Sequence, residues 1–81
     1  MPSVNGVAAR VQDLSERDDI PSNVANKLEE AVNILQNEDK DISVRVNTVS
    51  SIFDQVSNDP NIRQHTRTEI WNIASKVESL D

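Results

Sequence analysis

The sequence predicts an all-α fold, a single compact up-down four-helix bundle that occupies the whole chain, residues 1–81. Helix breakers are rare, because the chain holds one glycine and three prolines. Apolar residues recur at helical spacing in four stretches, and none of these alternates between apolar and polar residues as a half-buried strand does. Connections of roughly three to five residues favour antiparallel neighbours. The expected helices cover residues 3–17, 21–36, 42–57 and 60–80.

The first two helices have recognisable start signals. Ser3 can cap the first helix with its hydroxyl, whereas Gly6 weakens the first turn by about 1 kcal/mol relative to alanine. Pro21 suits the first position of the second helix, where a backbone N–H would have no partner within the helix. The two apolar stripes are Val4, Val7, Ala8, Val11 and Leu14, and then Val24, Leu28, Ala31, Val32 and Leu35.

The third and fourth helices each follow an acidic connection. The third follows Asp41, and the fourth follows the turn 58–61, in which Asp59 can cap the helix and Pro60 can open it. The third stripe consists of Ile42, Val46, Val49, Phe53 and Val56. The fourth consists of Ile62, Thr66, Ile70, Ile73, Val77 and Leu80.

The helix starts show a faint internal repeat. Ile20, Ile42 and Ile62 each follow an aspartate within three residues, at spacings of 22 and 20 residues. Such an echo is typical of degenerate helical repeats, but a stable array needs about three repeats or more. A bundle in which four helices close on one another is therefore the favoured arrangement.

The chain is acidic and has no cysteine. It carries 8 basic and 14 acidic side chains, a formal net charge of −6. This balance argues against a general nucleic-acid binder, since phosphate binding relies on clustered lysine and arginine. The absence of cysteine excludes disulfides, thiolate zinc sites and cysteine nucleophiles. No run approaches the roughly 20 apolar residues that span a bilayer, and the start of the chain lacks a secretory signal pattern, so we expect a cytoplasmic protein without membrane contact.

Several short motifs resemble a known protein family. The turn Asn-Asp-Pro-Asn at 58–61 is followed at 66–73 by Thr-Arg-Thr-Glu-Ile-Trp-Asn-Ile. With Asp-Ile-Pro at 19–21 and Val-Arg at 44–45, these residues resemble the archaeal family UPF0147, whose members are small proteins of unknown function. The resemblance implies an all-α bundle from an archaeon, and it implies no activity, ligand or catalytic residue. The chain departs from the family's pattern, which has proline and alanine there, at Arg63 and Thr66.

The sequence shows no motif for catalysis, metal binding or cofactor binding. His65, the single histidine, falls toward solvent on the helical wheel one turn before Glu69, which predicts an exposed helical pair rather than general acid–base chemistry. The segment Asp39-x-Asp41 resembles the start of a calcium loop, but the glycine and glutamate that complete such a loop are missing. We therefore predict a protein that is not an enzyme and that has no catalytic, cofactor-binding or metal-binding residues.

Trp71 is the residue that most favours an interaction role. It points about 140° away from the centre of the apolar stripe of its helix. One interpretation is structural, with Trp71 packed on the first helix or on a terminus. The other is an interface anchor, because a large aromatic side chain on a polar face is typical of a contact hot spot. The candidate interface then comprises Trp71, Arg67, Gln64, Ser75 and Glu78.

Three arginines form a candidate basic patch, Arg45, Arg63 and Arg67. Each lies near the start of a helix, where a cation opposes the helix dipole. This placement indicates either pairing with acidic neighbours or a small patch for an acidic partner or an RNA phosphate. The leading hypothesis is an acidic interaction module that self-associates, as a homodimer for example, or that binds a protein partner. The alternative is an accessory factor of an RNA-containing assembly, which the net charge of −6 makes the less favoured of the two.

Overall fold

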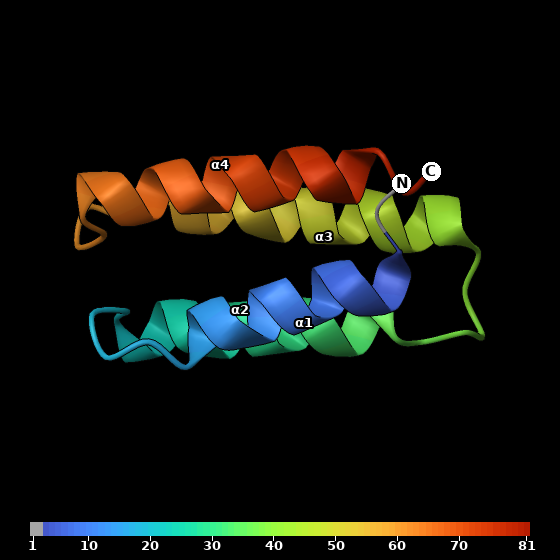
Figure 1. Cartoon of the computed structure of the whole chain (residues 1–81), viewed down its shortest axis with the longest axis horizontal. Coiled ribbons are helices and arrows are strands. Elements are labelled where there is room, and N and C mark those ends of the chain that lie inside the picture. The colour runs from blue at the N-terminus through green and yellow to red at the C-terminus, as the bar shows by residue number, and fades with distance from the viewer. Residues whose placement is uncertain (1–2) are drawn as a thin grey trace.

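The computed structural model describes residues 3–81, and these residues contain four helices and no strand. They are α1 (Val4–Ser15), α2 (Ser22–Leu35), α3 (Ile42–Ser57) and α4 (Gln64–Glu78). Figure 1 shows an up-down arrangement in which α1 and α4 lie on the near side and α2 and α3 behind them. The α1–α2 and α3–α4 connections share one end of the bundle, and the α2–α3 connection lies at the other. The predicted all-α four-helix bundle is confirmed.

The core is formed by the apolar stripes of the four helices. The largest fully buried side chains include Phe53, Leu28, Leu35 and Ile70. Burial of such side chains is the main favourable term in folding, at roughly 25 cal/mol per Å² of apolar surface. The predicted stripes are buried except at their ends, where Val4, Ile42 and Leu80 are only partly covered. Ile52, which the third stripe did not include, is also buried, at 6% exposure.

The three connections have the same backbone design. Each comprises six residues between consecutive helices, 16–21, 36–41 and 58–63, which is longer than the periodicity suggested. In each, the carbonyl of the second residue accepts the N–H of the fifth, as between Arg17 and Ile20. Ile20 and Ile62 occupy this fifth position and are buried at 9% and 5% exposure. Ile42 instead begins α3, so the third member of the sequence echo is not structurally equivalent to the other two.

The predicted start of the fourth helix at residue 60 is wrong, because α4 begins at Gln64. Asp59 does not cap the helix, since its side-chain oxygen accepts the backbone N–H of Asn61 at 2.8 Å and closes a turn. Pro60 lies within this turn, and the chain must first bury Ile62 before it becomes helical. The side-chain cap predicted for α1 is present, with Ser3 Oγ accepting the N–H of Gly6 at 3.0 Å.

The four helices do not pack equally. Among the four pairs of neighbouring helices, α1 and α2 pack most extensively and α1 and α4 least, so the seam between the first and last helices is the loosest. Two open hollows of about 400 and 510 Å³ lie along this seam. None of the described helices is long and apolar enough to cross a bilayer.

Candidate functional site

Trp71 lies on the surface of α4 with 53% of its area exposed. Within residues 3–81 the other large hydrophobic residue that is exposed is Val44, in the first turn of α3, at 48%. The predicted neighbours Gln64, Ser75 and Glu78 are exposed too. Ile70 and Val77 of the same helix are fully buried, so α4 is anchored on the core while about half of the Trp71 surface is open to solvent.

Arg67, the remaining predicted neighbour, is half-buried and bonded to the backbone. Its Nε donates to the Ser57 carbonyl at 2.8 Å, and its Nη2 donates to the Asp59 carbonyl at 3.0 Å. The carbonyls at the carboxyl end of a helix have no partner within the helix, so Arg67 satisfies part of the open end of α3. Its guanidinium is therefore a structural group at the edge of the Trp71 surface.

Arg45 repeats this arrangement at the opposite end of the bundle. Its Nη1 donates to the Leu35 carbonyl at 2.8 Å, ten residues before it, and its Nε donates to the Lys40 carbonyl at 3.0 Å. Arg67 likewise reaches ten residues back to Ser57. The unfavourable position of a cation near a helix start is thus offset by bonds to the end of the preceding helix.

The structure does not bring the three predicted basic residues together. Arg45 follows the α2–α3 connection, whereas Arg63 and Arg67 flank the start of α4 at the other end of the bundle (Figure 1). Consecutive helices run antiparallel, so the starts of α3 and α4 lie at opposite ends. Arg63 is the exposed member, and it precedes α4 without a side-chain cap.

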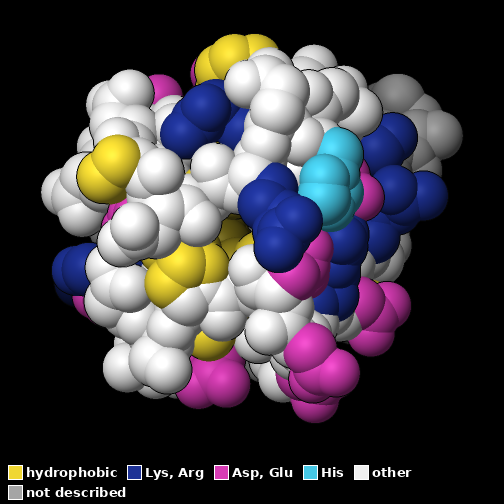
Figure 2. Space-filling view, turned by 90° about the vertical axis from the view of Figure 1, so that its left-hand side faces the viewer, with side chains coloured by type: hydrophobic (Ala, Val, Ile, Leu, Met, Phe, Trp, Pro, Cys, Tyr) yellow, Lys and Arg dark blue, Asp and Glu magenta, His cyan; other side chains and the backbone are white. Residues whose placement is uncertain are grey.

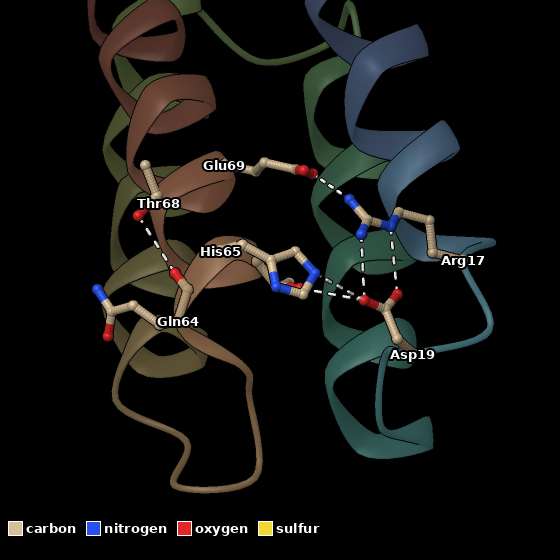
Figure 3. A network of polar contacts seen from close by, with 7 residues as sticks. Arg17, Asp19, Gln64, His65, Thr68 and Glu69 are labelled. Atoms are coloured by element: carbon tan, nitrogen blue, oxygen red, sulfur yellow. Dashed lines mark hydrogen bonds and ion pairs between the residues drawn. The ribbon is translucent and has the colours of Figure 1, made fainter.

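A polar network crosses the seam between α1 and α4 (Figure 3). Arg17 donates through Nη2 to Asp19 Oδ2 at 3.1 Å and through Nη1 to Glu69. His65 Nε2 lies 3.3 Å from the same Asp19 oxygen, and Thr66 Oγ1 donates to it at 3.3 Å. From the helical spacing, the sequence predicted an exposed pair of His65 with Glu69. In the structure each bonds across to the α1–α2 connection instead.

A family model shows where this chain belongs. The model of the uncharacterised protein family UPF0147 matches residues 3–80. The chain belongs to this family. A UPF0147 protein of Methanothermobacter thermautotrophicus is 43% identical over 76 residues, 94% of this chain and 74% of the relative. One of Methanocaldococcus jannaschii is 36% identical over 77 residues, 95% of this chain and 83% of the relative. No solved structure gives a significant match.

The family resemblance drawn from the sequence motifs is confirmed by these relatives, which are archaeal. A UPF0147 protein of Thermoplasma volcanium is a further example, 34% identical over 76 residues, 94% of this chain and 85% of the relative. The matched region includes the turn at 58–61 and the start of α4, so the polar and aromatic surface of α4 lies within the family's domain.

In this UPF0147 chain the network fixes the charge of Asp19. Partial burial on its own raises the pKa of the Asp19 carboxyl, but the hydrogen bond and charge of Arg17, with the hydrogen bond of His65, outweigh it and lower the pKa. The hydrogen bond to Glu69 is the main cause that raises the pKa of Arg17. Asp19 is therefore a carboxylate at neutral pH, and it joins the α1–α2 connection to α4.

The polar network around Asp19 links the α1–α2 connection to α4. Asp19 Oδ2 already faces three donors, from Arg17, His65 and Thr66, which occupies the oxygen that a catalytic carboxylate would offer to a substrate. Among residues 3–81, no group of three or more histidine, aspartate or glutamate side chains is arranged to hold a metal ion.

Proposed function

We propose that this UPF0147 chain is a non-enzymatic interaction module that self-associates through the Trp71 surface, defined by Trp71, Arg67, Gln64, Ser75 and Glu78. The observation that carries the proposal is the 53% exposure of Trp71. The other aromatic residue, Phe53, is buried at 2% exposure, so the core does not require the indole. Tryptophan is among the residues most enriched at interface hot spots.

The Trp71 surface has the features of a preorganised anchor. α4 is fixed from below by buried Ile70 and Val77, and Arg67 is held by the backbone carbonyls at the end of α3. A side chain on a rigid helix loses little conformational freedom on binding, which leaves more of the buried area as affinity. The exposed polar residues around the ring are suited to form the rim of such a contact.

A second copy of the chain is the partner that this surface fits best. A two-fold interface is made by the same patch on both copies, so one aromatic anchor per chain is enough to build it. Domains of this size also gain stability by burying a shared face. Each copy carries a net charge of −6, so the copies repel each other at long range and added salt should strengthen the association.

The alternative role, an accessory factor that contacts RNA through arginines, has weaker support. The guanidinium groups of Arg45 and Arg67 are bonded to helix-end carbonyls and are less free to bind phosphate. Of the three arginines in the candidate basic patch, Arg63 alone is exposed, whereas nucleic-acid affinity rises with the number of phosphates that are neutralised.

Light scattering across a dilution series tests the proposal. The expected result is a molar mass that rises from that of a monomer to that of a dimer with concentration, at lower concentration when salt is added. Trp71→Ala should stay monomeric, while Val44→Ala, which removes the other exposed large hydrophobic side chain, should dimerise like the unmodified chain. Equal masses for the Trp71→Ala variant and the unmodified chain at every concentration would overturn the proposal.

A further inference from the structure

The smaller hollow of the α1–α4 seam lies where α1 begins and α4 ends. It has a volume of about 400 Å³. Its lining is unusual for this chain, because it combines hydroxyl groups and cations from two helices. The described residues that line it are Ser3, Gly6, Val7, Arg10, Ser75, Lys76 and Ser79.

The charge of this hollow differs from that of the rest of the molecule. Arg10 and Lys76 both line it, no carboxylate is among its described lining residues, and neither cation forms an ion pair with a residue of 3–81. The neighbouring hollow of about 510 Å³ shares Arg10 with this one and is balanced in charge, since Asp13 and Glu69 line it beside Arg10 and Arg17. Figure 2, which views the bundle from the end with the α1–α2 and α3–α4 connections, shows basic side chains along one side beside the histidine, with acidic side chains among them. Two cations without an ion pair to a described residue therefore line one small hollow of an acidic chain.

The sign of the electrostatic potential in this hollow is set by charged side chains rather than by helix dipoles. The hollow lies between the start of α1 and the end of α4, so the two helix dipoles act on it with opposite signs and largely cancel. Lys76 lies in the last turn of α4, where it compensates the negative end of that helix. Arg10 is the second cation of the hollow, and it forms no ion pair with a described residue, although it also lines the neighbouring hollow with Asp13 and Glu69.

The hydroxyl groups and Gly6 shape the hollow for a small polar ligand. The Ser75 hydroxyl forms no hydrogen bond with a described residue, and Ser3 Oγ uses only its acceptor side, toward Gly6 N–H. A Cβ at position 6 would lie 2.9 Å from Ser3 Oγ and would displace that hydroxyl. Val7 also lines the hollow and is 2% exposed, so its side chain belongs mainly to the core.

We propose that this hollow binds a phosphoryl group, carried by inorganic phosphate or by a small phosphate monoester. A phosphoryl group presents at least three acceptor oxygens, and it matches a guanidinium fork, an ammonium and serine donors. A compact ligand also suits the charge distribution. Such a ligand stays within the Debye length, about 8 Å, of the two cations, so their attraction to it is only partly screened by salt. A long polyanion would extend farther along the molecule and would be repelled by the acidic side chains of the rest of the chain.

A nuclear magnetic resonance titration of the ¹⁵N-labelled full chain tests this site. Sodium phosphate, and separately glycerol 3-phosphate, is added at neutral pH, with sodium chloride used to keep the ionic strength constant. The expected result is saturable shifts of the backbone amides at 3–7 and 75–79, where the lining residues lie. Tighter binding of glycerol 3-phosphate would identify a monoester as the ligand, and tighter binding of inorganic phosphate would identify the free ion.

Two variants locate the site. Arg10→Gln/Lys76→Gln should weaken binding by at least about tenfold, because two charge-assisted contacts are lost. Arg63→Gln, which removes an exposed arginine beyond the far end of the seam, should bind as the unmodified chain does. The single variants Arg10→Gln and Lys76→Gln decide the question if the double variant does not give a folded spectrum. Shifts that fail to saturate for both ligands, or unchanged affinity in the variants at Arg10 and Lys76, would overturn the proposal.

Discussion

The carboxyl ends of α2 and α3 are closed in the same way, and the end of α1 is treated differently. Arg45 and Arg67, each in the first turn of the next helix, donate to carbonyls ten residues earlier. The equivalent position of α2 is Ala25, which cannot do this. At that connection Arg17 extends across to Glu69 of α4, 52 residues away. The α2–α3 and α3–α4 connections are therefore closed by local caps, whereas the α1–α2 connection is joined to the last helix by a partly exposed long-range network.

This difference explains where the molecule is tight and where it is open. A cap ten residues away closes a short loop and costs little chain entropy. The network at the α1–α4 seam must order distant, partly exposed side chains, and exposed ion pairs contribute little to stability. The seam is accordingly the loosest helix contact and contains the two hollows.

The largest expected effect is the loss of the α3 cap. Arg67→Ala leaves carbonyls at the half-buried end of α3 without their donor, and it should lower the free energy of unfolding by about 2–3 kcal/mol. Urea denaturation followed by circular dichroism measures this. Arg63→Ala, four residues earlier and exposed, is the matched control and should change stability by less than about 0.5 kcal/mol. Equal losses in the two variants would show that Arg67 is not a cap.

A smaller effect is expected at the other local cap. Arg45→Ala removes bonds to the Leu35 and Lys40 carbonyls, of which the second is exposed to water, so we expect a loss of about 1–2 kcal/mol. Hydrogen exchange should show faster opening at 33–40 and unchanged protection at 55–62. Faster exchange at both connections would contradict the local character of the two caps.

The contribution of the long-range network should be visible in the pH dependence of folding stability. Removing the network should cost little stability at neutral pH. The pKa of Asp19 is lower in the folded chain than its ordinary value of 3.8, so its contribution is present above that value and is lost as pH falls through the folded pKa. Asp19→Asn should therefore flatten the loss of stability in acid and destabilise the neutral protein less than Arg67→Ala does. The measurement is the midpoint of urea unfolding of the unmodified chain and of Asp19→Asn at a series of pH values from neutral to acid. An unchanged acid profile would show that Asp19 is not coupled to folding.

The smallest expected effect concerns the start of α1. Ser3→Ala removes the cap bond to Gly6 N–H and should cost about 1 kcal/mol. Gly6→Ala gains helix propensity of similar size but displaces the Ser3 hydroxyl, so the two terms should nearly cancel. Thermal melts of the two variants check this. A clear stabilisation by Gly6→Ala would show that the Ser3 cap contributes nothing.

The features that the sequence predicted are those that depend on near neighbours along the chain. The apolar stripes, the Ser3 cap and the outward direction of Trp71 all follow from helical periodicity or from a contact within one turn. The start of α4 was missed because the Asp59–Asn61 turn competes with a helix cap built from the same residue types. The pairing of His65 with Asp19 was missed because 46 residues separate them and no local pattern signals the contact.

The arginine caps were predicted only in part, because the sequence indicated unusual arginines but not the groups that they contact. Their sequence signal was visible as cations at unfavourable positions near helix starts, and it predicted either pairing with acidic neighbours or a small surface patch. The structure shows that the compensating groups are backbone carbonyls, which carry no sequence signature. The spacing of 22 residues between Arg45 and Arg67 therefore reflects a repeated connection rather than a shared binding surface.

Fluorescence of Trp71 across a dilution series is the most direct test of the proposed self-association, because the chain has a single tryptophan. We expect emission typical of an exposed indole in dilute protein and a blue shift at higher concentration, with the same midpoint as the rise in molar mass. Emission that stays constant at all concentrations, whether or not the mass doubles, would contradict a role for Trp71 as the anchor.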